Sequence, residues 1–101
     1  LVNIDGMGNR VACLIHGPKH VYIVAGMNKI TANIGDALNR VQNIATPPNG
    51  VRLNRQTPCA YVGHCENCFS PDCMCNQIVI TRHSGLTGRI KVFLVAEELG
   101  Y

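Results

Sequence analysis

The cysteine content of one short segment constrains this chain more than any other feature of its sequence. Of the six cysteines, five fall between residues 59 and 75, with the spacing C-x5-C-x2-C-x4-C-x-C. The surrounding residues 47–76 show little apolar periodicity and hold four of the five prolines. A long segment of this kind is uncommon in a small domain unless something other than a hydrophobic core holds it. The cysteines are the candidates for that role.

The cysteine spacing favours a metal site, with two alternatives left open. In Cys65-Glu66-Asn67-Cys68, the two intervening residues allow one tight turn to present both thiolates to one metal ion. Thiolates are soft ligands that suit zinc or an iron–sulfur cluster, and coordination would order a segment poor in apolar residues. Disulfides are the second interpretation, although nothing in the sequence indicates an oxidising compartment. The third is that the cysteines are reduced thiols on a partner-binding surface.

Length, hydrophobicity and charge exclude several classes of protein. The chain has 101 residues, enough for one domain with a modest core, and 47% hydrophobic residues make it too apolar for a disordered segment. No apolar run reaches the roughly 18–20 residues of a membrane span, and no signal-peptide pattern opens the sequence. The net charge of +3 is mild, without a lysine-rich block or an aromatic ladder. We therefore expect no membrane insertion and no nucleic-acid partner.

The first third of the chain has the pattern of β-strands. Alternating apolar and polar residues at 1–5 and an apolar run at 11–15 predict a hairpin over residues 1–15, with turn residues between its strands. In this hairpin Cys13 would be a small core residue. The β-branched run at 20–25 predicts a strand that is buried on both faces.

A helix and two further strands are predicted after this region. Apolar residues recur at helical spacing through 34–45, with Asn33 as the N-cap, and the helix is expected to end at Thr46-Pro47-Pro48-Asn49-Gly50. A pair of strands follows at 77–83 and 89–96, joined by a short turn. This order of elements predicts a single α/β domain with a mixed sheet.

Two polar segments are candidates for binding an anionic ligand. The turn at residues 5–10 has glycines that let backbone N–H groups approach an anion, and an arginine that pairs with carboxylate or phosphate. An ordinary hairpin turn is the other interpretation, since the motif is not a G-x-G-x-x-G pattern that opens a helix. A second segment, at 28–29, follows the predicted buried strand, at the edge where α/β sheets bind ligands; a solvated loop is the alternative. The candidate ligand-binding residues are Asp5, Gly6, Gly8, Asn9, Arg10, Asn28 and Lys29. No catalytic residue is identifiable from sequence order.

Several of these segments together resemble one protein family. The sequence VNIDGMGNRVA at residues 2–12 is similar to a recurrent motif of the LUD domain of lactate-utilisation proteins B and C. Further similarity lies in Gly17-Pro18-Lys19, in VAGMNKI at 24–30, in the cysteine-rich segment (residues 57–76) and in VAEELGY at 95–101. The resemblance runs nearly from end to end, and it includes stand-alone members of the family whose activity is uncharacterised.

The resemblance implies a fold and a cellular role. The fold would be a three-layer α/β sandwich with a mixed sheet, similar to the isomerase and CoA-transferase-like superfamily. Residues 1–101 would be a partial LUD-like domain, corresponding to the C-terminal half of the family domain, and we expect such a part to fold poorly by itself. The role would be cytoplasmic and linked to the oxidation of lactate to pyruvate, sometimes alongside separate iron–sulfur modules.

The resemblance also implies which cysteines act together. The family's cysteine pattern maps onto Cys59, Cys65, Cys68 and Cys75, which would hold zinc or an iron–sulfur cluster. Cys73 stands where many members carry arginine, which makes it the spare thiol. No catalytic residue of the stand-alone family carries over to this chain.

Three functions follow from these observations. The first is a LUD-type domain that takes part in organic-acid oxidation within a redox complex and binds a small anionic metabolite. Its partners would be other lactate-utilisation subunits and further copies of itself in a homo-oligomer. The second is a non-enzymatic, metal-stabilised subunit whose cysteine-rich segment docks a partner. The third is an enzyme of the sugar-phosphate isomerase or CoA-transferase kind, which rests on fold analogy alone.

Overall fold

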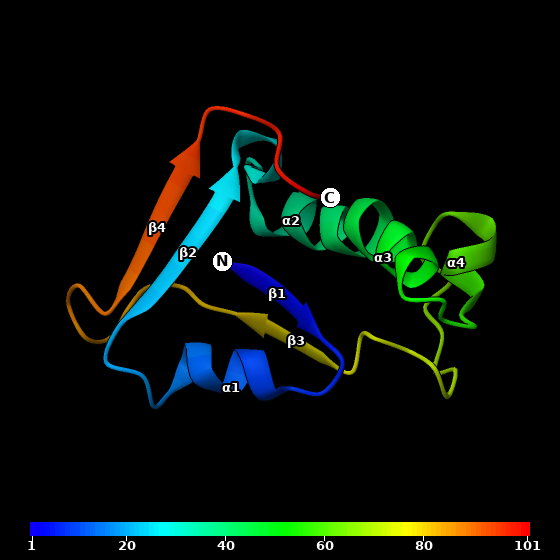
Figure 1. Cartoon of the computed structure of the whole chain (residues 1–101), viewed down its shortest axis with the longest axis horizontal. Coiled ribbons are helices and arrows are strands. Elements are labelled where there is room, and N and C mark those ends of the chain that lie inside the picture. The colour runs from blue at the N-terminus through cyan, green and yellow to red at the C-terminus, as the bar shows by residue number, and fades with distance from the viewer.

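Short strands and helices alternate along the chain, which is the pattern of an α/β fold (Figure 1). The computed structural model describes residues 1–101. In chain order the elements are β1 (Val2–Asp5), α1 (Asn9–Ile15), β2 (Val21–Gly26), the 3₁₀ turn η1 (Met27–Lys29), α2 (Ile34–Arg40), the π-helical turn η2 (Val41–Ala45), α3 (Thr46–Arg52), α4 (Pro58–Val62), β3 (Gln77–Ile80) and β4 (Ile90–Val95). The prediction of an α/β architecture is confirmed.

The strands form two separate two-stranded sheets, where a single mixed sheet was predicted. β1 pairs antiparallel with β3, beginning with Val2 opposite Ile80. β2 pairs in parallel with β4, beginning with Val21 opposite Ile90. A parallel pair needs a long crossover connection, and residues 27–89 provide it. The two late strands are therefore present as predicted, but they pair with early strands and not with each other.

A helix follows β1, so the hairpin predicted over residues 1–15 is wrong. Gly8 has φ +85°, a left-handed conformation that turns the chain out of β1 and into α1. Val11 and Leu14 lie three residues apart on one face of this helix and are buried. Cys13 is exposed, which contradicts its predicted place in the core. The glycine turn thus does open a helix, although a short one.

One helical stretch runs through α2, η2 and α3. Its predicted start is confirmed, because Oδ1 of Asn33 accepts the N–H of Asp36 at 2.8 Å. Its predicted end is wrong, since the helix continues through Pro47 and Pro48 to Arg52. The prolines fall in the first turn of α3, directly after the π-helical turn, where a missing N–H interrupts no regular α-helical bond.

The buried core is small. Eight of the 101 residues are buried, and the hydrophobic ones among them are Val11, Leu14 and Cys59. The first two lie on α1 and the third on α4, within the cysteine-rich segment. α3 and α4 approach closely because residue 50 is a glycine: a Cβ there would lie 3.3 Å from the Cβ of Ala60.

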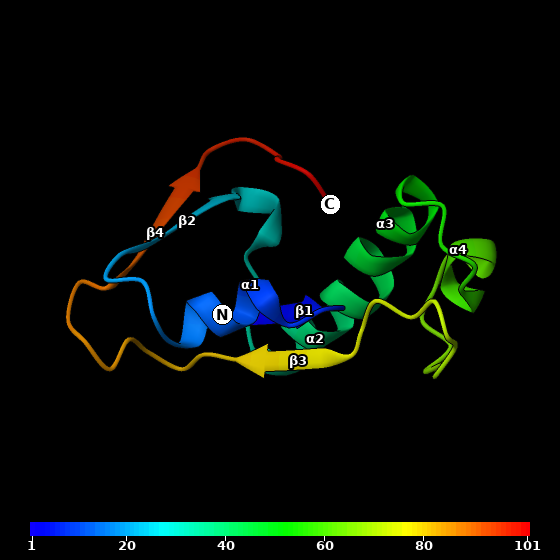
Figure 2. The same cartoon turned by 60° about the horizontal axis from the view of Figure 1, so that its bottom comes forward.

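One face of β2 is uncovered, so the predicted burial on both faces is wrong. Tyr22 and Val24 are 60% and 66% exposed, whereas Ile23 and Ala25 on the other face are half-buried. Figures 1 and 2 show the rest of the chain on one side of the β2–β4 pair. None of the helices has the length and apolar character needed to cross a lipid bilayer.

Candidate functional site

A cavity of about 1080 Å³ opens between the two sheets and the helical stretch. β1 and β2 supply apolar walls, and side chains of α2, η2 and α3 line it from the other side. Asp5 is the only acidic residue in this lining. The basic residues are Arg10, Lys29, Arg40, Arg52 and Arg55. A mostly apolar hollow with an excess of positive charge suits a small organic anion.

The five basic side chains differ in the ion pairs and hydrogen bonds that they already form within the protein. Arg55 forms an ion pair with Asp72 at 3.0 Å, outside the cavity lining. Arg40 donates through Nε to a backbone carbonyl at 2.9 Å. Lys29 and Arg52 pair with no acidic side chain, so their charges remain uncompensated.

The structure brings only part of the predicted ligand-binding set to the cavity. The residues in the lining are Asp5, Gly6, Arg10 and Lys29. Those outside it are Gly8, Asn9 and Asn28. Gly8 lies instead against the side chain of Gln77 on β3, since a Cβ at residue 8 would be 3.3 Å from Cδ of that glutamine.

Asp5 holds the glycine turn from the inside. Its buried carboxylate accepts the N–H of Val11 at 3.2 Å and lies 3.7 Å from Nε of Arg10. Burial raises the pKa of Asp5, but the N–H of Val11, the charge of Arg10 and the N–H groups of Gly8 and Gly6 together bring it below its usual value. The anion that these backbone N–H groups face is thus the chain's own carboxylate. The Arg10 side chain of this turn is 69% exposed and can meet a ligand.

We expect acid to destabilise the fold through Asp5 and Asp72. The pKa of Asp72 is also lowered, by the N–H of Gln56 and by the side chain of Arg55. A carboxyl whose pKa is lower in the folded state stabilises the fold fully above the unfolded pKa of roughly 4, and this contribution is lost as the pH falls through the folded value. The Tm should therefore fall below about pH 4 in thermal melts. A double variant, Asp5→Asn with Asp72→Asn, should have a flatter pH profile, and an unchanged profile would contradict this assignment.

Asn28 holds the C-terminal segment (residues 97–101) and does not line the cavity. Its Nδ2 donates to the carbonyl of Gly100 at 3.1 Å, and its Oδ1 accepts the N–H of Leu99 at 3.2 Å. Its backbone carbonyl accepts Nε of Arg40, which orients that guanidinium beside the cavity. Both polar atoms of the Asn28 side chain are therefore used within the fold, and neither is left for a ligand.

The four predicted metal ligands, Cys59, Cys65, Cys68 and Cys75, are not gathered around one point. No three cysteine, histidine, aspartate or glutamate side chains are placed so that they could hold a metal ion. Cys59 is buried on α4, with its sulfur 3.3 Å from the Thr57 hydroxyl. The N–H of Cys65 donates to the Asn43 side chain of η2 at 2.8 Å. All six cysteines are free thiols, and the assignment of zinc or an iron–sulfur cluster to four of them stays a prediction.

Cys73, the expected spare thiol, lies in contact with two other cysteines. Its thiol donates to the carbonyl of Cys68 at 3.9 Å, and its sulfur accepts the N–H of Cys75 at 3.3 Å. Burial raises the pKa of Cys75 to about 11, with the charge of Cys73 adding to the effect. The pKa of Cys68 is lowered, because the backbone and hydroxyl of Ser70 hydrogen-bond to its sulfur. Cys68 thus forms a thiolate more readily than Cys75.

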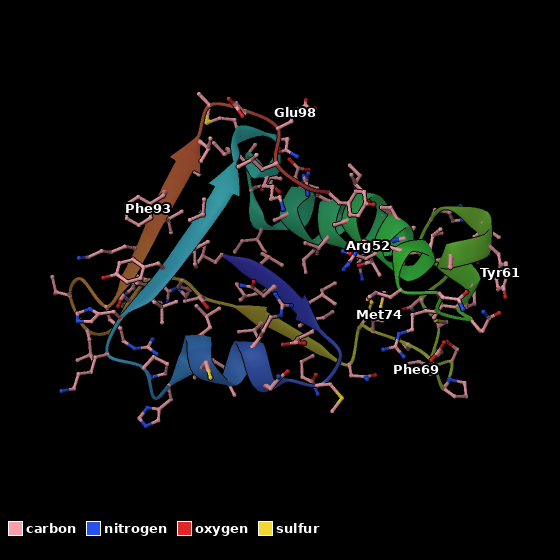
Figure 3. The ribbon with its side chains drawn as sticks, in the orientation of Figure 1. Arg52, Tyr61, Phe69, Met74, Phe93 and Glu98 are labelled. Carbon is pink, nitrogen blue, oxygen red and sulfur yellow. The ribbon has the colours of Figure 1, made fainter.

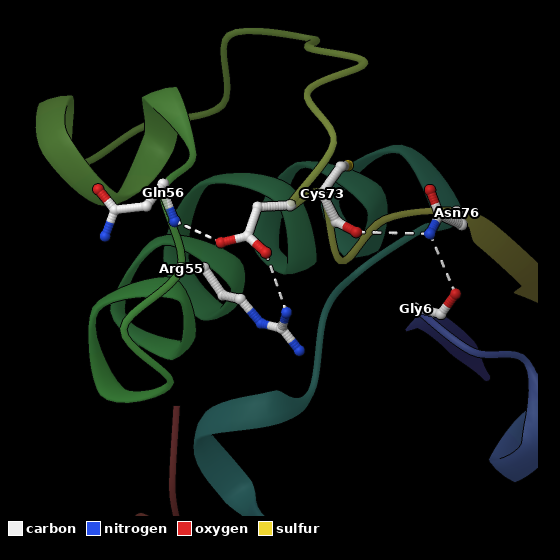
Figure 4. A network of polar contacts seen from close by, with 6 residues as sticks. Gly6, Arg55, Gln56, Cys73 and Asn76 are labelled. Carbon is white, nitrogen blue, oxygen red and sulfur yellow. Dashed lines mark hydrogen bonds and ion pairs between the residues drawn. The ribbon is translucent and has the colours of Figure 1, made fainter.

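Polar contacts hold the cysteine-rich segment where a metal was expected to do so (Figure 4). Asp72 accepts the N–H of Gln56 at 2.6 Å and Nη1 of Arg55 at 3.0 Å. Asn76 donates through Nδ2 to the carbonyl of Gly6 at 3.1 Å. This last bond joins the cysteine-rich segment to the glycine turn, so the two motifs singled out in the sequence are neighbours in the fold.

Sequence reasoning missed the part of the cavity formed by the helices. Arg52 of α3 and Met74 of the cysteine-rich segment both line it, and Figure 3 shows the two side chains in the same region. Tyr101 completes the lining on this side. Arg40 and Arg52 lie in the last turns of α2 and α3, where a basic residue ordinarily indicates an interaction with the helix dipole. Only the fold shows that they border one cavity.

Comparison with protein families matches residues 1–95 to the LUD domain. Searches of curated proteins and of solved structures find no match to the chain. The family match covers both motifs that line or border the cavity, the glycine turn and the cysteine-rich segment.

Proposed function

The chain belongs to the LUD domain family, and from this premise we propose that it binds a small organic-acid anion in the cavity. The observation that carries the proposal is the excess of basic over acidic side chains in the lining, five against one. LUD domains occur in proteins associated with lactate utilisation. The ligand class that we propose is therefore a short hydroxy or keto acid, such as lactate or pyruvate.

Three basic side chains are the proposed ligand contacts. Lys29 and Arg52 have no acidic partner. The Arg10 side chain is 69% exposed, and its guanidinium also donates to the Ile4 carbonyl at 3.1 Å and lies 3.7 Å from Asp5. A carboxylate that meets one of these side chains compensates its positive charge and gains charge-assisted hydrogen bonds. The apolar walls from β1 and β2 lower the local dielectric constant and so strengthen these contacts.

Removing one of these charges should weaken binding of the acid by about tenfold, which corresponds to roughly 1.4 kcal/mol for a lost charge-assisted hydrogen bond. Titration calorimetry with lactate and pyruvate on the Lys29→Ala and Arg52→Ala variants measures this. Lys19→Ala is the matched control, because Lys19 is exposed and lies outside the cavity lining. Equal affinity in all variants would place the acid elsewhere, and tighter binding of a sugar phosphate than of lactate would favour an isomerase-like enzyme.

In the cell we propose that the domain takes part in organic-acid oxidation as one component of a cytoplasmic redox complex. Its partners would be other lactate-utilisation subunits and further copies of this chain. The two small sheets would then belong to the three-layer α/β sandwich that the family resemblance implies. Support for this role comes from the family match and from the anion-suited cavity.

A docking module is the second candidate, and one surface of the cysteine-rich segment favours it. Phe69 is 98% exposed and Tyr61 is 72% exposed, although both are large and apolar enough to be expected in a core. Figure 3 shows both side chains at the outer end of the molecule, away from the sheets. A Phe69→Ser variant that binds lactate normally but no longer associates with a purified lactate-utilisation subunit would support docking. Unchanged association would count against it.

A further inference from the structure

A tight turn in the cysteine-rich segment brings two thiols together. The N–H of Cys73 donates to the carbonyl of Ser70 at 3.0 Å, which closes a four-residue turn with Pro71 at its second position. The turn folds the chain back, so that the Cys73 thiol donates to the carbonyl of Cys68. The Cys68 sulfur lies 3.6 Å from the Ser70 hydroxyl, on the same turn.

The two sides of this thiol pair differ in how they are held. Cys68 is partly exposed and directly precedes Phe69, which is 98% exposed and lies at the outer end of the molecule in Figure 3. Hydrogen bonds hold the backbone around Cys73 in place. The preceding residue, Asp72, accepts two of them, and the Cys73 carbonyl accepts Nδ2 of Asn76 at 3.4 Å (Figure 4). Both thiols are partly exposed, and the hydrogen bonds at Asp72 and Asn76 hold Cys73 in place next to Cys68.

We propose that Cys68 and Cys73 form a redox-active dithiol that a low-molecular-weight disulfide, such as oxidised glutathione, converts to an intramolecular disulfide. The Cys68 thiolate attacks one sulfur of oxidised glutathione, which forms a mixed disulfide and releases one glutathione thiolate. The Cys73 sulfur then attacks the Cys68 sulfur, which closes the protein disulfide and releases the second glutathione. The dithiol loses two electrons and two protons, and the oxidised glutathione gains both to become two glutathione molecules.

The neighbouring cysteines are less suited to be the partner of Cys68. Cys75 is half-buried, and its N–H already donates to the Cys73 sulfur. Cys65 accepts the N–H of Asn67 on its own sulfur at 3.4 Å and is tied to η2 through its backbone. Cys59 is buried on α4. The turn leaves Cys73 as the thiol in direct contact with Cys68.

Mass spectrometry of the full chain tests this pairing. The reduced, chelator-treated protein is incubated with oxidised glutathione, and remaining thiols are alkylated before digestion. Cleavage after Glu66 and before Asp72 isolates Cys68 on a peptide with no other cysteine. This peptide should be recovered linked to the one that holds Cys73 and Cys75, with the linked form in large excess over the glutathione adduct.

Three variants assign the link. Cys75→Ser should keep it, whereas Cys73→Ser should lose it and accumulate the mixed disulfide of Cys68 with glutathione. Cys13→Ser is the matched control, because Cys13 is an exposed cysteine of α1 that lies apart from the segment, and it should react as the unmodified chain does. A link that survives in Cys73→Ser, or only glutathione adducts in the unmodified chain, would overturn the proposal.

Discussion

Gly26→Ala should lower the free energy of unfolding by about 3 kcal/mol, because the C-terminal segment leaves no room for a side chain at this position. A Cβ there would lie 2.5 Å from the backbone nitrogen of Leu99 and 2.6 Å from the carbonyl oxygen of Glu97, and it would overlap Oδ1 of Asn28. Two of these atoms belong to the backbone and cannot turn away as the end of a flexible side chain would. The segment must move, and it then loses its bonds to Asn28 and the 3.1 Å bond from the Met27 N–H.

For a chain of this length the change corresponds to a fall in Tm of roughly 15 °C. Hydrogen exchange at residues 97–101 should become faster at the same time. Gly85→Ala is the matched control, because a Cβ at residue 85 meets no atom within 4 Å and the backbone there is not left-handed. If Gly26→Ala melted like the unmodified chain, or if both variants lost the same stability, the close approach of the segment to β2 would be wrong.

Removing the Arg89 side chain should lower the free energy of unfolding by roughly 2–3 kcal/mol. The guanidinium donates to the carbonyls of Leu14 at 2.7 Å, Pro18 at 2.8 Å and Cys13 at 2.9 Å. Two of these carbonyls belong to the last turn of α1, where no helical N–H is left to satisfy them and the helix dipole favours a cation. Arg89 directly precedes β4, so one side chain ties the β2–β4 pair to α1.

Urea denaturation of Arg89→Ala measures this loss, and Arg89→Lys should recover only a part of it. A lysine ammonium keeps the charge but lacks the planar fork that reaches three acceptors at once. Arg82→Ala is the control, because Arg82 forms no hydrogen bond or ion pair in the structure. Equal destabilisation by Arg82→Ala would show that the loss of net charge, and not the bonds to α1, is responsible.

Local patterns in the sequence predicted those elements whose causes are themselves local. The start of α2 follows from the Asn33 side chain, and β2 follows from a run of β-branched and aromatic residues, which favour extended backbone. The hairpin over residues 1–15 failed because its turn residues tolerate a left-handed conformation in either structure. The helix is favoured because it buries Val11 and Leu14 on one face. This burial depends on contacts with residues distant in sequence, which the local pattern does not contain.

The partners of the strands could not be predicted from the sequence, for a related reason. β3 and β4 are neighbours in sequence, and a hairpin is the usual expectation for two strands joined by a short glycine-containing turn. Each instead pairs with a strand from the first quarter of the chain. The packing of whole helices and strands determines which strands pair. The alternation of apolar and polar residues within one strand does not specify its partner.

The candidate site was predicted in part. Arg10 and Lys29 were found because each follows a strand end beside small residues that suit a ligand. Asn28 lies outside the lining, since its side chain bonds to residues about 70 positions away. Arg52 was missed because nothing in its neighbourhood distinguishes it from other basic residues at helix ends. The cysteine spacing predicted a common ligand set without Cys73, whereas in the fold Cys73 contacts both Cys68 and Cys75.

The pairing of early with late strands also determines when this chain acquires its sheets. The first residue bonds across 80 positions to Thr81, and β2 meets its partner only after the residues around Arg89 are in place. Contacts this distant in sequence carry a large loop-closure entropy and slow folding. On the ribosome, where synthesis proceeds at roughly 5–20 residues per second, β1 and β2 wait several seconds with open edges before their partners emerge. The helical stretch from α2 to α3 has its backbone hydrogen bonds between residues close in sequence, so its formation has no such delay.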